Sequence, residues 1–151
     1  MTVTARPQPT LDSGFLAPTP VYYDDLDSMG LVHNARYALM VERALHAFWE
    51  PRGYAFANGT YTHPDAFVAV AEYQISYKMP VRGTGHIAVQ LWIDQLGDSS
   101  AVYAFRIVSA DGATVHAEGR RVHIRLDPKT LRPTPWAPET KAICESLLLS
   151  A

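Results

Sequence analysis

Residues 25–37 decide the fold of this chain, and they read Asp25-Leu26-Asp27-Ser28-Met29-Gly30-Leu31-Val32-His33-Asn34-Ala35-Arg36-Tyr37. From the end of this stretch onward, apolar residues recur at helical spacing, namely Tyr37, Val41, Ala44, Leu45 and Phe48. The spacing predicts one helix of about 16 residues with a single buried stripe. Asn34 is the expected N-cap of this helix, and Pro51-Arg52-Gly53 is expected to end it.

The start of this helix is a candidate anion site. The first amides of a helix have no partner within it and carry the positive end of the helix dipole. A short turn containing Gly30 separates Asp27 from these amides. A carboxylate and a set of unpaired amides are therefore expected to face the same small space, where a carbonyl oxygen that gains negative charge would be stabilised.

Composition sets limits on the class of protein. The chain has 151 residues, of which 48% are hydrophobic and 19% charged, as expected for one domain with its own core. A net charge of −2 argues against nucleic-acid binding. The lone Cys144 excludes an intrachain disulfide and a multi-cysteine zinc site, and it favours the reducing cytoplasm. No apolar run approaches the ~18 residues that a membrane span requires, so no membrane association is expected.

Four strand-like segments follow a loop over residues 54–65. They are centred on Phe67–Tyr77, Ile87–Ile93, Tyr103–Ile107 and Val115–Leu126, with turns at Gly97–Ser100 and Asp111-Gly112. The apolar parity of the last segment changes along its length, which predicts a bulge near Arg120 and Arg121. A further short strand is expected at residues 20–23.

This element order predicts an α+β fold in which a curved antiparallel sheet of five to six strands wraps around one long helix. Pairing of an edge strand with a second copy would complete the cover of the helix. We expect a flexible, proline-rich tail over residues 1–18, the folded domain over residues 19–138, and a helical or flexible tail over residues 139–151.

Three motifs occur in order along the chain: Asp25-x-Asp27-x-x-Gly30-x-Val32-x-Asn34-Ala35-x-Tyr37, Tyr77-x-x-Pro80-x-x-Gly83 and Leu126-Asp127-x-x-Thr130-x-Arg132-Pro133. With the element order, they resemble the hotdog fold, and specifically the 4-hydroxybenzoyl-CoA thioesterase-like family of acyl-CoA thioesterases. The resemblance implies hydrolysis of an aliphatic or aromatic acyl-CoA without a metal or other cofactor. It also implies a homodimer, assembled into a homotetramer, with the site at the dimer interface.

The resemblance assigns the chemistry to two residues. Asp27 would be the catalytic carboxylate, acting either as a nucleophile or as a general base, and the Asn34 backbone N–H would polarise the thioester carbonyl. The ordinary alternative is that Asp27 only satisfies the amides of its turn. Many relatives have histidine at the position of Leu31, so His33 does not inherit that role. Plant-type acyl-carrier-protein thioesterases use asparagine and histidine at the positions of Met29 and Leu31, so their chemistry is excluded.

Further candidates surround this pair. The candidate substrate-binding residues of the motif are Gly30, His33 and Tyr37, and the candidate phosphate-binding residues are Lys78, Arg82, Arg120 and Arg121. The loop aromatics Tyr54, Phe56 and Tyr61 are candidates for shaping an acyl pocket. Asp25 is either a positioning residue or a solvated turn acid. Glu42 is either a helix-borne catalytic carboxylate or half of a buried salt bridge with an arginine.

Two other functions compete with acyl-CoA hydrolysis. One is the same chemistry on an acyl carrier protein of a fatty-acid or polyketide pathway. The other, from a different class, is a non-catalytic hotdog protein that binds an acyl chain. No Gly-x-Ser-x-Gly elbow occurs in the chain, and a single cysteine is too few for a deaminase-type zinc site. A serine hydrolase and a metal-dependent enzyme are therefore not expected.

Overall fold

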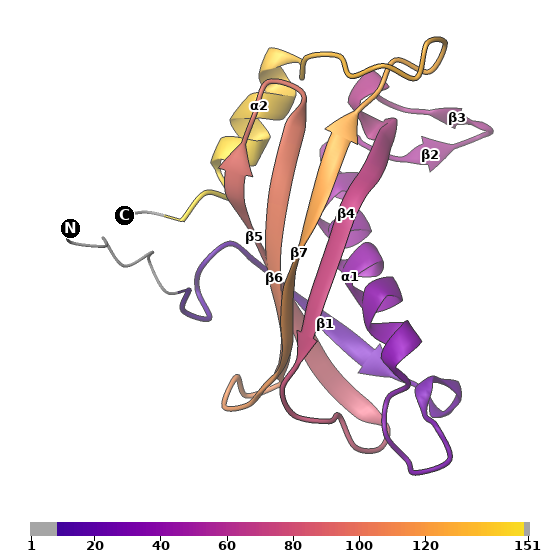
Figure 1. Ribbon diagram of the computed structural model, residues 1–151, viewed down its shortest axis with the longest axis vertical. Coiled ribbons are helices and arrows are strands. Elements are labelled where there is room, and N and C mark those ends of the chain that lie inside the picture. Colours follow the sequence, from indigo (N-terminus) through magenta and orange to yellow (C-terminus); the bar gives the residue numbers. More distant parts are fainter. Residues whose placement is uncertain (1–8, 150–151) are drawn as a thin grey trace.

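The computed structural model describes residues 9–149 and shows one curved antiparallel sheet with a long helix in its concave side (Figure 1). The sheet has five strands in the order β1-β5-β6-β7-β4. Its strands are β1 (Phe15–Val21), β4 (Val68–Tyr77), β5 (Gly85–Leu96), β6 (Ser100–Ser109) and β7 (Val115–Arg125). The helix is α1 (Asn34–Trp49), and a second helix, α2 (Pro138–Glu145), follows the sheet. The predicted α+β hotdog architecture is confirmed.

Helix α1 has the predicted length of 16 residues and the predicted buried stripe, to which the structure adds Met40. Its N-cap differs from the prediction. His33, not Asn34, is the cap, because its Nδ1 accepts a hydrogen bond from the Ala35 amide at 3.2 Å. Asn34 is consequently the first helical residue. The helix ends at Trp49 and continues into a short turn at Glu50–Arg52, after which Gly53 adopts the left-handed conformation with φ 93°.

The predicted loop over residues 54–65 carries a small hairpin of β2 (Phe56–Ala57) and β3 (Thr60–Tyr61). The turn between these strands places Asn58 and Gly59 at φ 54° and 78°, as an Asn-Gly hairpin turn requires. The turn predicted at Gly97–Ser100 also joins its two strands, β5 and β6.

The bulge predicted near Arg120 and Arg121 is wrong. Ala117, Arg121 and His123 are all buried, so this stretch of β7 keeps one alternation throughout. Against β6, the register of β7 shifts between Ile107 and Val108. Against β4 it shifts between Val70 and Glu72, which pair with His123 and Val122, so the extra residue lies on β4 and not on β7. The apparent change of parity arose because inward positions of this strand hold an arginine and a histidine, which the hydrophobic pattern assigns to the outside.

The first strand begins earlier than the prediction over residues 20–23, since β1 starts at Phe15 and pairs with β5 along its whole length. Residues just before β1 cover the outer face of the sheet. The amide of the fully buried Gln90 side chain donates to the carbonyls of Thr10 and Ser13. Gly14 is required here, because a Cβ would lie 2.1 Å from the Leu91 carbonyl oxygen. The part of the predicted tail at residues 1–8 lies outside the described residues.

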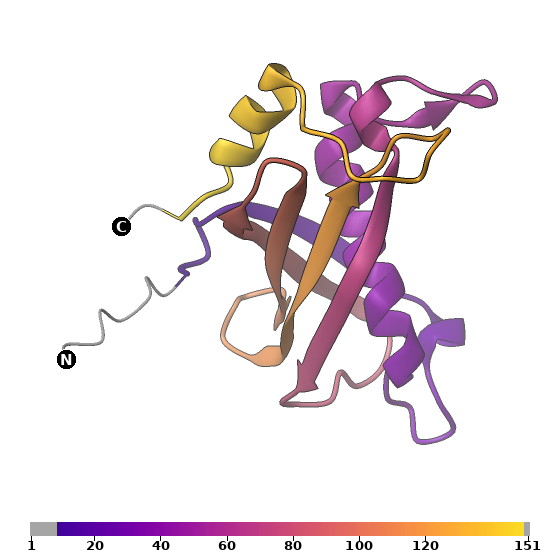
Figure 2. The ribbon, with the colours of Figure 1, turned by 45° about the horizontal axis from the view of Figure 1, so that its top comes forward.

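The segment that carries α2 is part of the fold. The Ile93 amide donates to the Leu147 carbonyl at 2.9 Å, and α2 packs beside the end of β5 (Figure 2). Cys144 of α2 is 1% exposed, and burial raises the pKa of its thiol to about 12, so this side chain packs as an uncharged group. Within the described residues, no helix is long and apolar enough to cross a membrane.

A buried carboxylate ties α2 to the loop before β4. Asp65 is 4% exposed, and its Oδ2 accepts hydrogen bonds from the Ala137 amide at 2.8 Å and the Thr140 hydroxyl at 2.5 Å. Arg125 Nε lies 2.5 Å from Asp65 Oδ1, in an ion pair whose angle departs from that of a hydrogen bond. This carboxylate therefore joins three separate segments of the chain.

We predict that Asp65→Ala lowers the free energy of unfolding by about 3–5 kcal/mol, because it removes a fully buried carboxylate that accepts two hydrogen bonds and pairs with the half-buried Arg125. The matched control is Asp98→Ala, which removes an ion pair with Lys141 from a side chain that is 93% exposed. This control should change the free energy of unfolding by less than about 1 kcal/mol. Urea denaturation measures both values, and equal losses in the two variants would contradict the role assigned to Asp65.

Candidate active site

Asp27 lies on a short hairpin that leads into α1. Leu26 and Val32 form an antiparallel bridge at its base, and the Asp27 amide donates to the Leu31 carbonyl at 2.7 Å. The turn closes through the Gly30 amide, which donates to the Asp27 carbonyl at 3.0 Å. Gly30 has φ 74°, a conformation that glycine adopts without strain. The predicted glycine-containing turn before the helix is thus present.

The two oxygens of the Asp27 carboxylate have different environments. Oδ1 accepts hydrogen bonds from the Met29 amide at 2.8 Å and the Leu31 amide at 3.1 Å. Within the described residues, Oδ2 has no hydrogen-bonding partner. The side chain is half-buried. One oxygen therefore fixes the carboxylate in its turn, as the ordinary alternative requires, and the other remains available for chemistry.

Asp25 is a structural residue of the same segment. It is 3% exposed, its Oδ2 accepts from the Tyr22 amide at 2.8 Å, and its carbonyl accepts from the His33 amide at 2.8 Å. Arg36 Nε lies 3.9 Å from Asp25 Oδ1. These contacts hold the segment before Asp27 against the first turn of α1. The positioning alternative for Asp25 agrees with this geometry, and the solvated-acid alternative does not.

The start of α1 retains one unpaired amide. The amides of Ala35 and Arg36 donate to His33, through its Nδ1 and its carbonyl respectively. The Asn34 amide has no acceptor within the described part of the chain, and Asn34 is exposed. The first turn of a helix stabilises negative charge. His33 acts as the cap that shapes this site, which leaves the Asn34 N–H as its free donor.

Two tyrosines, Tyr37 and Tyr77, pack at the start of α1. Tyr37 is buried, and its ring meets that of Tyr77 edge-on with centroids 5.3 Å apart. Burial raises the pKa of Tyr37, so its hydroxyl stays protonated. The Tyr77 hydroxyl donates to the Asn34 carbonyl at 3.3 Å. The end of β4 is therefore attached to the start of α1.

The four candidate phosphate-binding residues do not form one cluster within a single subunit. Arg82 is exposed. It lies beside the Asp27 turn, because its backbone forms an antiparallel bridge with Leu31. Lys78 pairs with Glu118 at 3.5 Å, and Arg120 pairs with Glu72 at 2.6 Å. Arg121 is 6% exposed and pairs with Glu42 at 2.6 Å. Arg121 is therefore buried and already has a carboxylate partner, and the ion pair with an arginine that was one alternative for Glu42 is present, with the Glu42 side chain 43% exposed.

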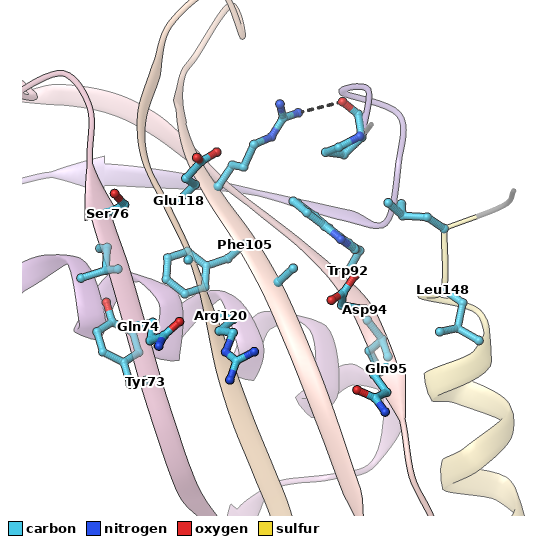
Figure 3. Close-up of a pocket in the computed structure, with 17 residues that line it drawn as sticks. Tyr73, Gln74, Ser76, Trp92, Asp94, Gln95, Phe105, Glu118, Arg120 and Leu148 are labelled. Carbon is cyan, nitrogen blue, oxygen red and sulfur yellow. Dashed lines mark hydrogen bonds between the residues drawn. The ribbon is translucent and has the colours of Figure 1, made fainter. Parts of the chain in front are cut away.

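A groove of about 1260 Å³ crosses the sheet on the side away from α1. Figure 3 shows Trp92 and Asp94 of β5 and Glu118 and Arg120 of β7 along it. Cations and carboxylates alternate on this surface, so it has no single sign of charge. Neither Asp27 nor Asn34 lines the groove.

A smaller cavity of about 350 Å³ lies on the inner side, between α1 and β7. Its lining includes the three loop aromatics that were candidates for an acyl pocket, Tyr54, Phe56 and Tyr61. Its polar side includes Arg121, which was a candidate for phosphate binding, and His123, which sequence reasoning missed. These two residues are two positions apart in a strand, so they share a face, and that spacing was the available signal. The Asp27 hairpin does not line this cavity either.

Comparison with known proteins identifies the family. The family described as the thioesterase-like superfamily matches residues 21–144. This chain belongs to that superfamily. The chain is 27% identical over 119 residues to the acyl-CoA thioester hydrolase YbgC of Escherichia coli, an alignment that covers 79% of this chain and 87% of the relative. The predicted enzyme class is confirmed: the protein is a thioester hydrolase.

Solved structures show the same architecture. The PA5185 protein of Pseudomonas aeruginosa superposes with a TM-score of 0.79 at 25% identity, covering 96% of this chain and 99% of the other. A 1,4-dihydroxy-2-naphthoyl-CoA thioesterase from Synechocystis superposes with a TM-score of 0.78 at 18% identity, covering 89% of this chain and 98% of the other. Both support the hotdog fold.

We predict a pH dependence of stability that comes from His123. Burial first, and then the nearby charge of Arg121, lowers the pKa of His123 from 6.5 to about 3. Between these values the unfolded chain binds more protons than the folded protein, so the free energy of unfolding falls as pH decreases. The loss should be about 2 kcal/mol between about pH 7 and pH 5.

This dependence is measured by urea denaturation of the wild type and His123→Gln at the two pH values. The variant should show a flatter dependence, because it lacks the buried imidazole. The control is His86→Gln, whose side chain is exposed in the folded protein and which should retain the wild-type dependence. Identical slopes in the wild type and His123→Gln would refute the assignment.

Proposed function

We propose that this protein hydrolyses an acyl-CoA thioester to a free acid and coenzyme A, with Asp27 and the Asn34 amide as its catalytic groups. The observation that carries the proposal is that the two oxygens of the Asp27 carboxylate differ. Oδ1 is held by the amides of its turn, and Oδ2 has no hydrogen-bonding partner among residues 9–149. The hairpin that carries Asp27 leads directly into α1, whose first amide, at Asn34, has no acceptor within residues 9–149. The activity named for the related YbgC protein supports coenzyme A as the thiol of the substrate.

The two groups have complementary roles. The Asn34 N–H donates a hydrogen bond to the thioester carbonyl oxygen and stabilises the negative charge that develops there. Asp27 Oδ2 either attacks the carbonyl carbon, which breaks the C–S bond through a mixed anhydride that water hydrolyses, or removes a proton from a water that attacks the same carbon. In both routes, the sulfur leaves with the bonding electrons and takes a proton. The oxyanion donor contributes about 3–4 kcal/mol to transition-state stabilisation.

The remaining motif residues shape this site. Gly30 allows the tight turn that aims the carboxylate, His33 caps the helix, and Tyr37 packs beneath its first turn. Arg82, exposed beside the Asp27 turn, is the cation placed to meet a coenzyme A phosphate. Lys78 follows the end of β4, and Arg120 lies on the outer face of the sheet. We assign these two a weaker contribution, because each already has a carboxylate partner.

We propose that the working unit is a dimer joined through β4. Both β1 and β4 are edges of the sheet. Pro18 and Pro20 lie in β1, where each removes one backbone donor, whereas β4 has no proline over its 10 residues. The edge strand β4 exposes apolar side chains, with Val70 47% and Tyr77 52% exposed. A second copy of β4 would pair with this edge and cover these side chains.

Antiparallel pairing of β4 with its copy would complete the site. The inner cavity is lined by Val68 and Val70 at the start of β4. The end of β4 is bonded through Tyr77 to Asn34 at the start of α1. In an antiparallel pair related by a two-fold axis, the start of β4 in one subunit lies beside the end of β4 in the other. The partner subunit's Asn34 and the partner subunit's Asp27 would therefore approach the mouth of the cavity. Each site would then use the hairpin of one subunit and the cavity of the other.

We predict that Asp27→Asn lowers kcat for thioester hydrolysis by at least about 100-fold, because the amide cannot act as a base or as an efficient nucleophile. Coenzyme A release, followed with a thiol reagent, measures this across short, medium, long and aromatic acyl-CoA substrates. The matched control is Asp24→Asn, an exposed carboxylate on the same segment, which should retain activity. Full activity in a folded Asp27→Asn variant would overturn the proposal.

We also predict that the wild type sediments at twice the chain mass of 16.7 kDa or at a higher multiple. Val70→Lys should shift the protein toward monomer, because it places like charges near a two-fold axis. Leu16→Lys, at a 37% exposed position on the opposite edge, is the control and should leave the oligomer intact. Sedimentation velocity distinguishes these outcomes. A monomeric wild type would exclude a shared site.

A further inference from the structure

The inner cavity combines apolar walls with one polar side. Trp49, Tyr54 and Trp136 are among the aromatic residues that line it. The polar groups of this aromatic wall have partners: Trp49 Nε1 donates to the Tyr103 hydroxyl at 2.9 Å, and the Tyr54 hydroxyl bonds Thr140 at the same distance. A group that enters the cavity therefore contacts aromatic side chains whose polar atoms are already hydrogen-bonded.

The polar side is different, because two of its buried nitrogen atoms have no hydrogen-bonding partner among residues 9–149. They are Arg121 Nε and His123 Nε2, on side chains from residues that are 6% and 9% exposed. Buried polar atoms in folded proteins are nearly always hydrogen-bonded, so each exception requires an explanation. Both residues belong to the cavity lining. A bound oxygen atom beside either nitrogen would supply the missing acceptor, for His123 in the tautomer that carries its proton on Nε2.

The charge of the cavity decides what kind of oxygen that is. Glu42 lies 2.6 Å from the Arg121 guanidinium and neutralises it. His123 is uncharged near neutral pH, because burial and the charge of Arg121 lower its pKa to about 3. Of the other two carboxylates that line the cavity, Asp65 pairs with Arg125, and Glu50 is exposed to solvent. The Arg121–Glu42 pair and the neutral His123 therefore offer N–H groups without net charge. A hydroxyl or keto oxygen fits these donors better than a carboxylate, which would lose its hydration without gaining a counter-ion.

We propose that the cavity selects acyl groups that carry an uncharged oxygen, as a hydroxyl or keto group, near their far end, and that Arg121 and His123 are the specificity-determining residues. This inference rests on the proposed thioesterase function and on the shared dimer site. The cavity of about 350 Å³ has room for roughly ten non-hydrogen atoms, given about 30 Å³ for each water-sized group. Acyl groups of medium length match this volume.

The test compares isosteric substrates from butanoyl-CoA to decanoyl-CoA, each with a terminal methyl group or with a hydroxyl in its place. In the wild type, the ratio of kcat/KM for the hydroxyl substrate to that for the methyl substrate should exceed about tenfold at one chain length. His123→Phe should abolish this preference. The double variant Glu42→Gln/Arg121→Met, which removes both charges of the pair, should also abolish it. His86→Phe, an exposed histidine, is the control and should retain it.

A wild-type ratio at or below one at every chain length overturns the inference, as does a preference that survives both variants. A second readout separates this inference from the proposed function. Binding of the free acids is followed by the fluorescence of the cavity tryptophans in the wild type and in Asp27→Asn. Tighter binding of hydroxylated acids without thiol release would retain the cavity inference and refute the thioesterase proposal. No preference among the acids would overturn the cavity inference whatever the activity.

Discussion

One helix cannot cover one five-stranded sheet, and this mismatch organises the rest of the molecule. Five strands about 4.8 Å apart span roughly 20 Å, about twice the ~10 Å diameter of a helix. Helix α1 packs mainly against β1 and β5. The inner face near β7 and β4 is left with a cavity and with the ion pair between the buried Arg121 and the half-buried Glu42. The part of the fold that lacks helical cover is therefore also the part with room for a substrate.

The elements that the sequence predicts well are those that local contacts determine. The stripe of α1 is read from helical spacing, and the Gly97–Ser100 turn from its residue types, because each depends on neighbours within a few positions. The N-cap was misplaced by one residue for a related reason. Asn34 has the more usual capping side chain, but the Nδ1 atom of His33 serves equally well when its backbone is extended. Residue type alone did not distinguish these two neighbours.

Long-range contacts account for what the sequence did not reveal. Arg121 was expected at a strand bulge, where it could meet a phosphate, yet it is buried and pairs with Glu42, 79 positions earlier in the chain. The bulge was misplaced because two inward polar residues imitate a change of strand parity. Asp65 gave no signal at all, because its partners Arg125, Ala137 and Thr140 meet it only through the tertiary fold. The proposal for Asp27 instead rests on a short local motif and on the family resemblance that this motif carries, so it does not need such contacts.

This contrast has a consequence for how the site is built. The proposed catalytic groups, Asp27 on the hairpin and the Asn34 amide at the start of α1, lie seven positions apart, so a short segment fixes their relative placement. The cavity instead draws on the loop before β4, on β6 and β7, and on α2. Substitutions in the cavity can therefore change which acyl group is accepted while the hairpin keeps its geometry. In the proposed dimer the two are separated further, because the cavity of one subunit would hold the acyl group while the other subunit holds the reacting carbonyl.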